Sequence, residues 1–189
     1  MRMARTDQLK KTARDMLVSM ALIAVPLLAV VLWFPHDAKD PQDAVQTVDY
    51  SVSLRQARDP GTLPFEALAP VGLPAGWRAT SMHADFDPTA PLRWELGFQS
   101  PDHQYVALVQ VTGGKLVKGV LDTQVPNAST GAQTTVGGFT WTEYTSADGQ
   151  RRAIARTEEG TGTPATPVGV VVAGTGSFAE LEQFASALQ

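Results

Sequence analysis

Three side chains near the middle of the chain have the types and spacing that a divalent metal ion requires. His83, Asp85 and Asp87 alternate in the stretch HADFD, and alternate residues of a β-strand lie on the same face. An imidazole and two carboxylates on one face are a plausible ligand set for such an ion. The same alternation is typical of a solvent-facing strand, and Asp87-Pro88 favours the end of the strand. We therefore predict an ordinary strand face and keep the metal site as the alternative.

A second stretch imitates the glycine fingerprint of dinucleotide-binding domains. An apolar run leads into Gly174-x-Gly176-x-x-Ala179 and then into a helical pattern. The fingerprint works within a βαβ unit, with an acidic residue about 20 positions further on. No second strand follows before Gln189. The glycines are better explained as a turn into a capped helix, and we predict no cofactor.

Hydrolytic chemistry has little support in the sequence. There is no Gly-x-Ser-x-Gly elbow, and none of the three histidines, His36, His83 and His103, has an evident Ser or Cys partner. We predict no catalytic residues and a protein that is not an enzyme. A small extracytoplasmic hydrolase or metal-dependent enzyme is the alternative.

The periodicity beyond residue 46 predicts mainly β-structure. Alternating apolar residues indicate strands over 48–55, 77–86, 92–99, 104–111, 134–145 with a turn at Gly137-Gly138, 151–157 and 168–174. The segments 104–111 and 168–174 are apolar on both faces, so we expect them inside a sheet covered on both sides. Residues 62–76 contain three prolines and predict an extended, packed loop. Residues 124–133 and 158–167 are expected to be loops.

Two segments predict helices. Residues 115–122 have apolar residues at helical spacing and form a short helix. In residues 177–189, Ser177 and Glu180 form a capping box. The apolar stripe of this second helix is Phe178, Leu181, Ala185 and Leu188, with Phe184 beside it. The sum is an α+β domain with an antiparallel-rich sheet of seven or eight strands, a short helix and a C-terminal helix packed on the sheet.

The run from residue 16 to residue 34 predicts a transmembrane anchor. It has 19 residues and no charge, and as a helix it is ~28 Å long, close to the ~30 Å hydrocarbon core of a bilayer. Its proline is tolerated in a membrane helix. The residues expected to contact lipid are Met16, Leu17, Leu22, Ile23, Pro26, Leu27, Leu28, Leu32, Trp33 and Phe34.

Charge gives the expected orientation and the division of the chain. Residues 1–34 hold five basic and two acidic side chains, whereas the remainder holds ten basic and seventeen acidic. The basic side stays in the cytoplasm. We expect a basic cytoplasmic tail (1–15), the anchor (16–34), a linker (35–46) and an extracytoplasmic domain (47–189) that does not bind nucleic acid. Bulky Trp33 and Phe34 favour a retained anchor over a cleaved signal peptide.

Two further motifs have simple interpretations. Asn127-Ala128-Ser129 is a glycosylation sequon, a triplet that often arises by chance. Arg151-Arg152 begins a strand, and we interpret the pair as a charged sheet edge that discourages aggregation.

Several stretches carry a family resemblance. PVGLPAGWRATS (70–81), WELGFQSPDHQYVALVQ, VGGFTWTEY and the ending GTGSFAELEQFASALQ, together with the single anchor, resemble the actinobacterial domain-of-unknown-function family 4245. The resemblance implies a single-pass protein of the cytoplasmic membrane that faces the envelope, with no assigned activity. More loosely, LPAGW and the terminal helix are similar to PsbP/Mog1-like domains, which are mainly binding and assembly modules. We therefore expect a binding or assembly module that contacts the lipid bilayer through its anchor and an envelope protein, lipid or wall component through its outer domain.

Overall fold

The computed structural model describes residues 16, 19–20, 22–26, 46–113, 116–161 and 165–189. The chain divides between Ala44 and Val45 into two compact units.

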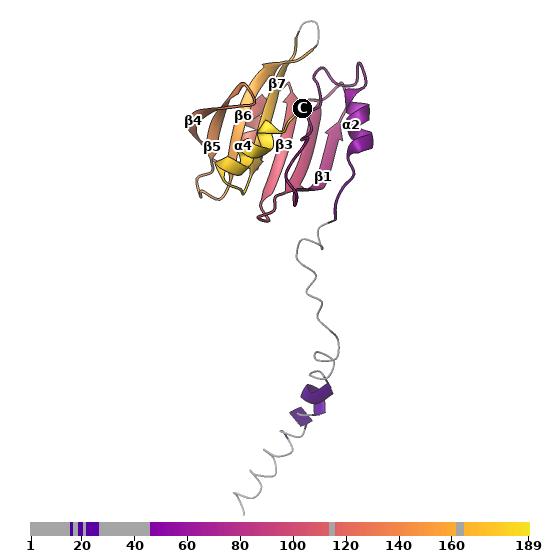
Figure 1. The fold of residues 1–189 in the computed structure, drawn as a ribbon, viewed down its shortest axis with the longest axis vertical. Coiled ribbons are helices and arrows are strands. Elements are labelled where there is room, and N and C mark those ends of the chain that lie inside the picture. Colours follow the sequence, from indigo (N-terminus) through magenta and orange to yellow (C-terminus); the bar gives the residue numbers. More distant parts are fainter. Residues whose placement is uncertain (1–15, 17–18, 21, 27–45, 114–115, 162–164) are drawn as a thin grey trace, which may run out of the picture. The chain divides into compact units, whose positions relative to one another are not determined.

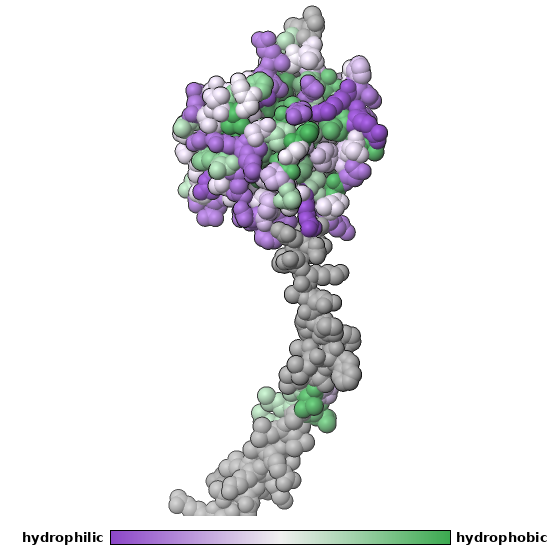
Figure 2. All heavy atoms as spheres, viewed as in Figure 1, coloured by the Kyte–Doolittle hydropathy of each residue, from purple (hydrophilic) through white to green (hydrophobic). Residues whose placement is uncertain are grey.

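In the first unit, the described residues are helical and their side chains are exposed. Met16, Leu22 and Ile23 are 70%, 75% and 66% exposed, and Figure 2 colours this group as hydrophobic. Among the described residues, no helix combines the length and the hydropathy needed to cross a membrane. The tail 1–15 and linker residues 35–45 lie outside the described residues, as do the anchor residues Leu17, Leu27, Leu28, Leu32, Trp33 and Phe34.

The second unit is an α+β domain built on one seven-stranded antiparallel sheet (Figure 1). The sheet order is β1-β2-β3-β7-β6-β5-β4. Two meanders, β1 to β3 and β4 to β7, are joined where β3 pairs with β7. The strands are β1 (Arg78–Asp85), β2 (Arg93–Gln99), β3 (Tyr105–Thr112), β4 (Ser129–Val136), β5 (Phe139–Thr145), β6 (Arg152–Glu159) and β7 (Pro167–Gly174). This confirms the predicted fold class of the domain.

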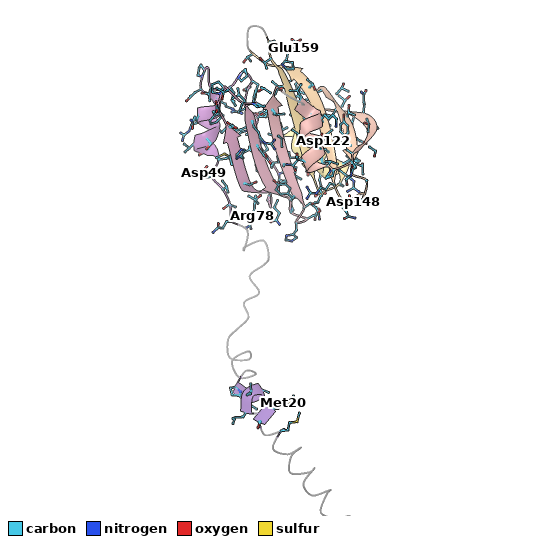
Figure 3. The ribbon with its side chains drawn as sticks, turned by 180° about the vertical axis from the view of Figure 1, so that it is seen from behind. Met20, Asp49, Arg78, Asp122, Asp148 and Glu159 are labelled. Carbon is cyan, nitrogen blue, oxygen red and sulfur yellow. The ribbon has the colours of Figure 1, made fainter. Side chains whose placement is uncertain are left out.

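Two of the helices cover opposite faces of the sheet. Helix α4 (Phe178–Ser186) lies in front of the sheet in Figure 1, and helix α3 (Leu116–Gln124), which carries Asp122, lies in front in the reverse view of Figure 3. Between them, β3 and β7 are buried on both faces, with Leu108, Val109, Val171 and Val172 all fully buried. The prediction of two doubly covered strands is therefore confirmed.

The C-terminal helix begins with the predicted capping box. The Glu180 backbone N–H donates to the Ser177 hydroxyl, and the Ser177 backbone N–H donates to the Glu180 carboxylate at 2.8 Å. The buried side of this helix consists of Leu181, Phe184 and Ala185. The short helix predicted over 115–122 is also present, as α3 from Leu116 onward; residue 115 lies outside the described residues.

The prediction of a strand over residues 48–55 is wrong. This segment enters helix α2 (Ser51–Arg58), because a helix brings Tyr50, Leu54 and Ala57 to one face, where they pack on the core, and leaves Val52 63% exposed. The Asp49 carboxylate accepts the free N–H of Ser51 at 2.9 Å at the start of this helix.

The prediction of a loop over residues 124–133 is wrong from Ser129 onward. Strand β4 begins there and pairs with β5, with a register shift between Thr130 and Gln133. The strand is almost wholly exposed, so no burial pattern marks it, and pairing with its neighbour determines its structure.

The proline-rich segment, residues 62–74, crosses the α4 face as an extended strap. Its Leu63, Phe65 and Ala67 are buried, as the prediction of a packed loop requires. Two side chains of the sheet bind its backbone. The buried Gln110 amide accepts from Leu68 N–H at 2.7 Å and donates to the carbonyl of Glu66 at 3.0 Å, and the Trp94 indole donates to the Leu68 carbonyl at 2.9 Å.

Candidate functional site

A cavity of about 520 Å³ lies on the strap side of the sheet. Strands β5 and β6 supply Phe139, Trp141, Arg156 and Glu158 to its lining. Its volume is in the range that holds small-molecule ligands.

The strap and the C-terminal segment supply the remaining lining of this cavity, through Glu66, Leu68, Ser186 and Leu188 among others. Backbone bonds join these two segments. Ala69 and Gln189 exchange hydrogen bonds at 3.0 Å in each direction, and Val71 N–H donates to the Ala187 carbonyl at 2.8 Å. Segments far apart in the sequence therefore hold the cavity together.

Strand alternation explains why a charged side chain lines this cavity. Ile154, Arg156 and Glu158 share one face of β6, and that face belongs to the core under the strap. Arg156 continues a row across the sheet, because it is paired with Val170 and Val170 is paired with Gln110. Arg156 thus places a guanidinium at a core-facing position of β6.

The guanidinium of Arg156 is desolvated and lies against two aromatic rings. Its central carbon is 3.8 Å from the centre of the Phe139 ring and 5.0 Å from that of Trp141, a geometry in which the ring faces attract the cation. The side chain is 8% exposed. Burial lowers the pKa of Arg156, and the ion pair with Glu158 opposes that effect.

The hydrogen bonds of Arg156 are incomplete in the described part of the chain. Its Nη1 contacts the Glu158 carboxylate, which is itself 27% exposed. Its Nε is shielded from solvent and has no hydrogen-bond partner. A buried donor without a partner costs about 1–3 kcal/mol, and such exceptions in native proteins require an explanation. The cavity therefore combines volume, aromatic walls and an unsatisfied charged donor.

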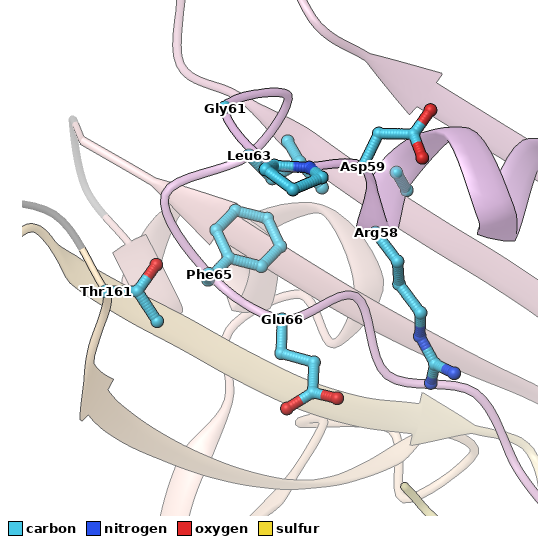
Figure 4. Close-up of a pocket in the computed structure, with 9 residues that line it drawn as sticks. Arg58, Asp59, Gly61, Leu63, Phe65, Glu66 and Thr161 are labelled. Atoms are coloured by element: carbon cyan, nitrogen blue, oxygen red, sulfur yellow. The ribbon is translucent and has the colours of Figure 1, made fainter.

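Two neighbouring cavities, of about 420 and 550 Å³, lie at the other end of the strap and share Gly61, Leu63 and Thr161. Figure 4 shows the first, with Leu63 and Phe65 among the residues that line it. Its cation, Arg58, donates to the carbonyls of Ala67 at 2.9 Å and Gln189 at 2.6 Å. Arg58 therefore has a structural role, which makes these cavities weaker candidates for a ligand site.

Two of the predicted metal ligands, His83 and Asp85, lie on the side of β1 that faces away from the strap. His83 lies opposite Glu95 and Asp85 lies opposite Arg93, whose guanidinium pairs with Glu95 at 2.7 Å. Among the residues that the structure describes, no three His, Cys, Asp or Glu side chains are grouped in a way that would hold a metal ion.

Asp87 lies beyond the end of β1, as Asp87-Pro88 suggests. Its carboxylate accepts from the backbone N–H of Thr89 at 2.9 Å and from the Thr89 hydroxyl at 2.7 Å. These bonds hold the pKa of Asp87 below its ordinary value. The side chain stabilises its own turn.

The glycine fingerprint has the simpler interpretation. Strand β7 lies between β3 and β6, antiparallel to both, so Gly174 and Gly176 do not belong to a βαβ unit. The N-terminus of α4 is capped by its own Ser177 and Glu180.

The interpretation of Arg151-Arg152 as a charged edge is wrong, because β6 pairs with β5 and β7 and is an interior strand. Arg151 donates to the Gln124 carbonyl at 3.2 Å and Arg152 to the Gly176 carbonyl at 3.4 Å. The sequence analysis also missed Arg156. The sequence did contain a signal: in the stretch AIART, strand alternation places Arg156 on the same face as the apolar Ile154.

A seven-stranded antiparallel sheet with helices on both faces and a ligand-sized cavity defines an α+β domain with a candidate binding site. The chain belongs to the family described as "Protein of unknown function (DUF4245)", whose model matches residues 8–188. No curated protein and no solved structure shows significant similarity to the chain. The family resemblance is confirmed at this level, and the likeness to PsbP/Mog1-like domains stays a prediction.

Proposed function

We propose that this protein is a membrane-anchored binding module without enzymatic activity. A single helix over residues 16–34 holds it in the cytoplasmic membrane, and the α+β domain contacts a protein, lipid or wall component of the cell envelope from outside. The uncharged run with its basic flank supports the anchor and its orientation. The described residues of that run are helical and expose apolar side chains, which is consistent with lipid contact.

The cavity around Arg156 is the observation that supports a binding role. A desolvated cation between aromatic rings, with an unsatisfied donor, is costly for a domain that needs only stability. A ligand that bonded to this group would offset the cost. The exposed ring of Phe139 at the same cavity, 51% exposed, offers a contact surface for a larger partner.

Photocrosslinking in intact cells tests this proposal. A photoreactive amino acid is placed at Phe139, which lines the cavity, and in a matched control at Val52, an exposed apolar residue of α2 outside it. We expect one reproducible adduct from position 139 and none of the same size from position 52. An adduct that persists with an unrelated anchor in place of residues 16–34 is a contact of the outer domain. Absence of a position-specific adduct contradicts a binding role for this cavity.

Membrane attachment has its own test. We expect the full-length chain to stay with vesicles during a carbonate wash, and a reporter fused at the C-terminus to be active only outside the cytoplasm. Release by carbonate, or a reporter that is active only in the cytosol, contradicts the anchor or its orientation.

A further inference from the structure

We propose that the Arg156 cavity recognises a small carboxylic acid with a compact apolar body, in its ionised form. This inference rests on the binding role proposed above and names the chemistry of the ligand. Its basis is the part of the guanidinium that the protein leaves without a partner.

The unpartnered Nε of Arg156 belongs to an edge with a defined geometry. A guanidinium is planar, and its Nε–H points parallel to one N–H of Nη2, which makes a fork that fits the two oxygens of a carboxylate. Glu158 contacts the other terminal nitrogen, Nη1, and Nε has no partner among the described residues. The edge suited to bidentate recognition is therefore the one that Glu158 does not use.

Charge around the cavity argues against a ligand with two negative charges. Glu66 and Glu158 both line it, so a doubly charged phosphate would meet two like charges near a single cation. A monocarboxylate meets the same guanidinium with less repulsion.

The walls favour an apolar body on that ligand. Leu68 and Leu188 face the cavity from the strap and the C-terminal segment, and Phe139 and Trp141 from β5. A ring or branched chain of a size that fits about 520 Å³ would bury apolar surface against them. Since Nε is shielded from solvent, a bound acid must move a neighbouring side chain, and the exposed Phe139 ring is the candidate.

Titration of the full-length chain in detergent micelles with benzoate tests the inference. The comparison ligands are benzamide, which has the same shape without the charge, and inorganic phosphate at matched ionic strength. Binding is followed by isothermal calorimetry and by tryptophan fluorescence, because Trp141 lies against Arg156. We expect saturable benzoate binding, at least about tenfold weaker binding of benzamide, and no competition by phosphate. Equal binding of benzoate and benzamide, competition by phosphate, or no benzoate binding overturns the inference.

Two variants assign the binding to this cavity. Arg156→Lys keeps the charge and loses the fork, so we expect at least about tenfold weaker benzoate binding. Ser186→Trp fills the cavity from α4 without changing Arg156 or Glu158 and is expected to abolish binding. Its matched control is Gln183→Trp, an exposed position on the same helix outside the lining, which should bind benzoate normally. Unchanged binding by Ser186→Trp overturns the inference even if Arg156→Lys fails to fold.

The outcomes separate this inference from the proposed function. A position-specific adduct at residue 139 without benzoate binding leaves the binding module in place and rejects the carboxylate. Absence of the adduct rejects the binding module itself, whatever benzoate does.

Discussion

The two faces of the central sheet are covered in different ways. Under α3 the core consists of small aliphatic side chains, such as Val109, Val120, Ala155 and Val171. Under α4 and the strap it contains large aromatic rings, among them Trp94, Phe98, Trp141 and Phe184, with Phe98 and Phe184 5.1 Å apart. The helix on the first face forms most of its backbone hydrogen bonds within itself. The strap on the second face depends on other segments for its hydrogen-bond partners.

This difference explains where polar groups enter the core. The strap has no regular ladder, so Gln110 and Trp94 reach out of the sheet to bond its backbone. The same face admits Arg156 and the largest rings, and irregular segments packed on large rings leave cavities. The apolar face under α3 fits closely because Gly169 of β7 lets the start of α3 approach. An extended cover thus leaves a cavity, whereas a helical cover makes a closely packed layer.

Truncation of one buried side chain under each helix is expected to give the largest contrast. Phe184→Ala on α4 should lower the free energy of unfolding by about 3–5 kcal/mol, and Val120→Ala on α3 by about 1.5–2.5 kcal/mol. Both side chains are at most 2% exposed, so the difference reports the size of the void. Urea unfolding of the full-length variants measures it, and equal losses would show that the two faces are energetically alike.

Loss of the strap contact is expected to have the next largest effect. Gln110→Leu leaves the Leu68 N–H and the Glu66 carbonyl without their partner and should cost about 2–4 kcal/mol. The matched control is Gln99→Leu on the other side of the sheet, because the buried Oε1 of Gln99 has no partner to lose. We expect that change to be neutral or stabilising.

Limited proteolysis supplies a second measurement for this pair. Cleavage within residues 62–74 should accelerate in Gln110→Leu and stay unchanged in Gln99→Leu. Similar cleavage of both variants would mean that Gln110 does not hold the strap.

Overpacking under α3 is expected to cost about 1–3 kcal/mol. A Cβ added in Gly169→Ala would lie 2.9 Å from the backbone nitrogen of Val117, so the first turn of α3 must shift. Hydrogen exchange should speed up in α3 and stay unchanged in the strap. Faster exchange in the strap as well would show that the two covers are coupled through the sheet.

The elements that followed from the sequence are those whose pattern is local. The capping box of α4 and the apolar alternation of β2 and β3 need no information from distant residues. Residues 48–55 were misassigned because Val48, Tyr50, Val52 and Leu54 fit a period of two, although Tyr50, Leu54 and Ala57 also fit a helix.

The candidate site was not predictable in the same way. In the sequence, Gln110 and Arg156 are isolated polar residues within apolar strands. The strap that explains Gln110 packs over β3, and its Leu68 is more than 40 positions from Gln110 in the chain. His83 and Asp85 lie on the other side of the sheet, opposite Glu95 and Arg93, and Asp87 lies in a turn where it accepts from Thr89. Their alternate spacing indicates one face of a strand and does not indicate a cavity.

The smallest expected effect is a loss of stability in acid. It should depend on a carboxylate beside the α3 face and not on the strap. The strap is held by groups that do not titrate in acid, the Gln110 amide, the Trp94 indole and the Arg58 guanidinium. The turn beside the end of α3 instead depends on a carboxylate: Asp148 accepts from the Ser146 hydroxyl at 2.5 Å and from Gln150 N–H at 3.0 Å. These bonds hold the pKa of Asp148 below its ordinary value of 3.8. Their contribution to stability is therefore present above the unfolded-state pKa and is lost as the pH falls through the folded-state pKa.

Asp148→Asn should accordingly destabilise the domain slightly at neutral pH and reduce the slope of stability against pH between about pH 5 and pH 2. Thermal unfolding across that range measures the slope, with Gln110→Leu as the comparison. The Gln110 variant is less stable at every pH but should keep the slope of the unaltered chain, because the amide does not titrate. A changed slope in Gln110→Leu would mean that acid acts on the strap, and the contrast between an attachment that titrates in acid and one that does not would no longer hold.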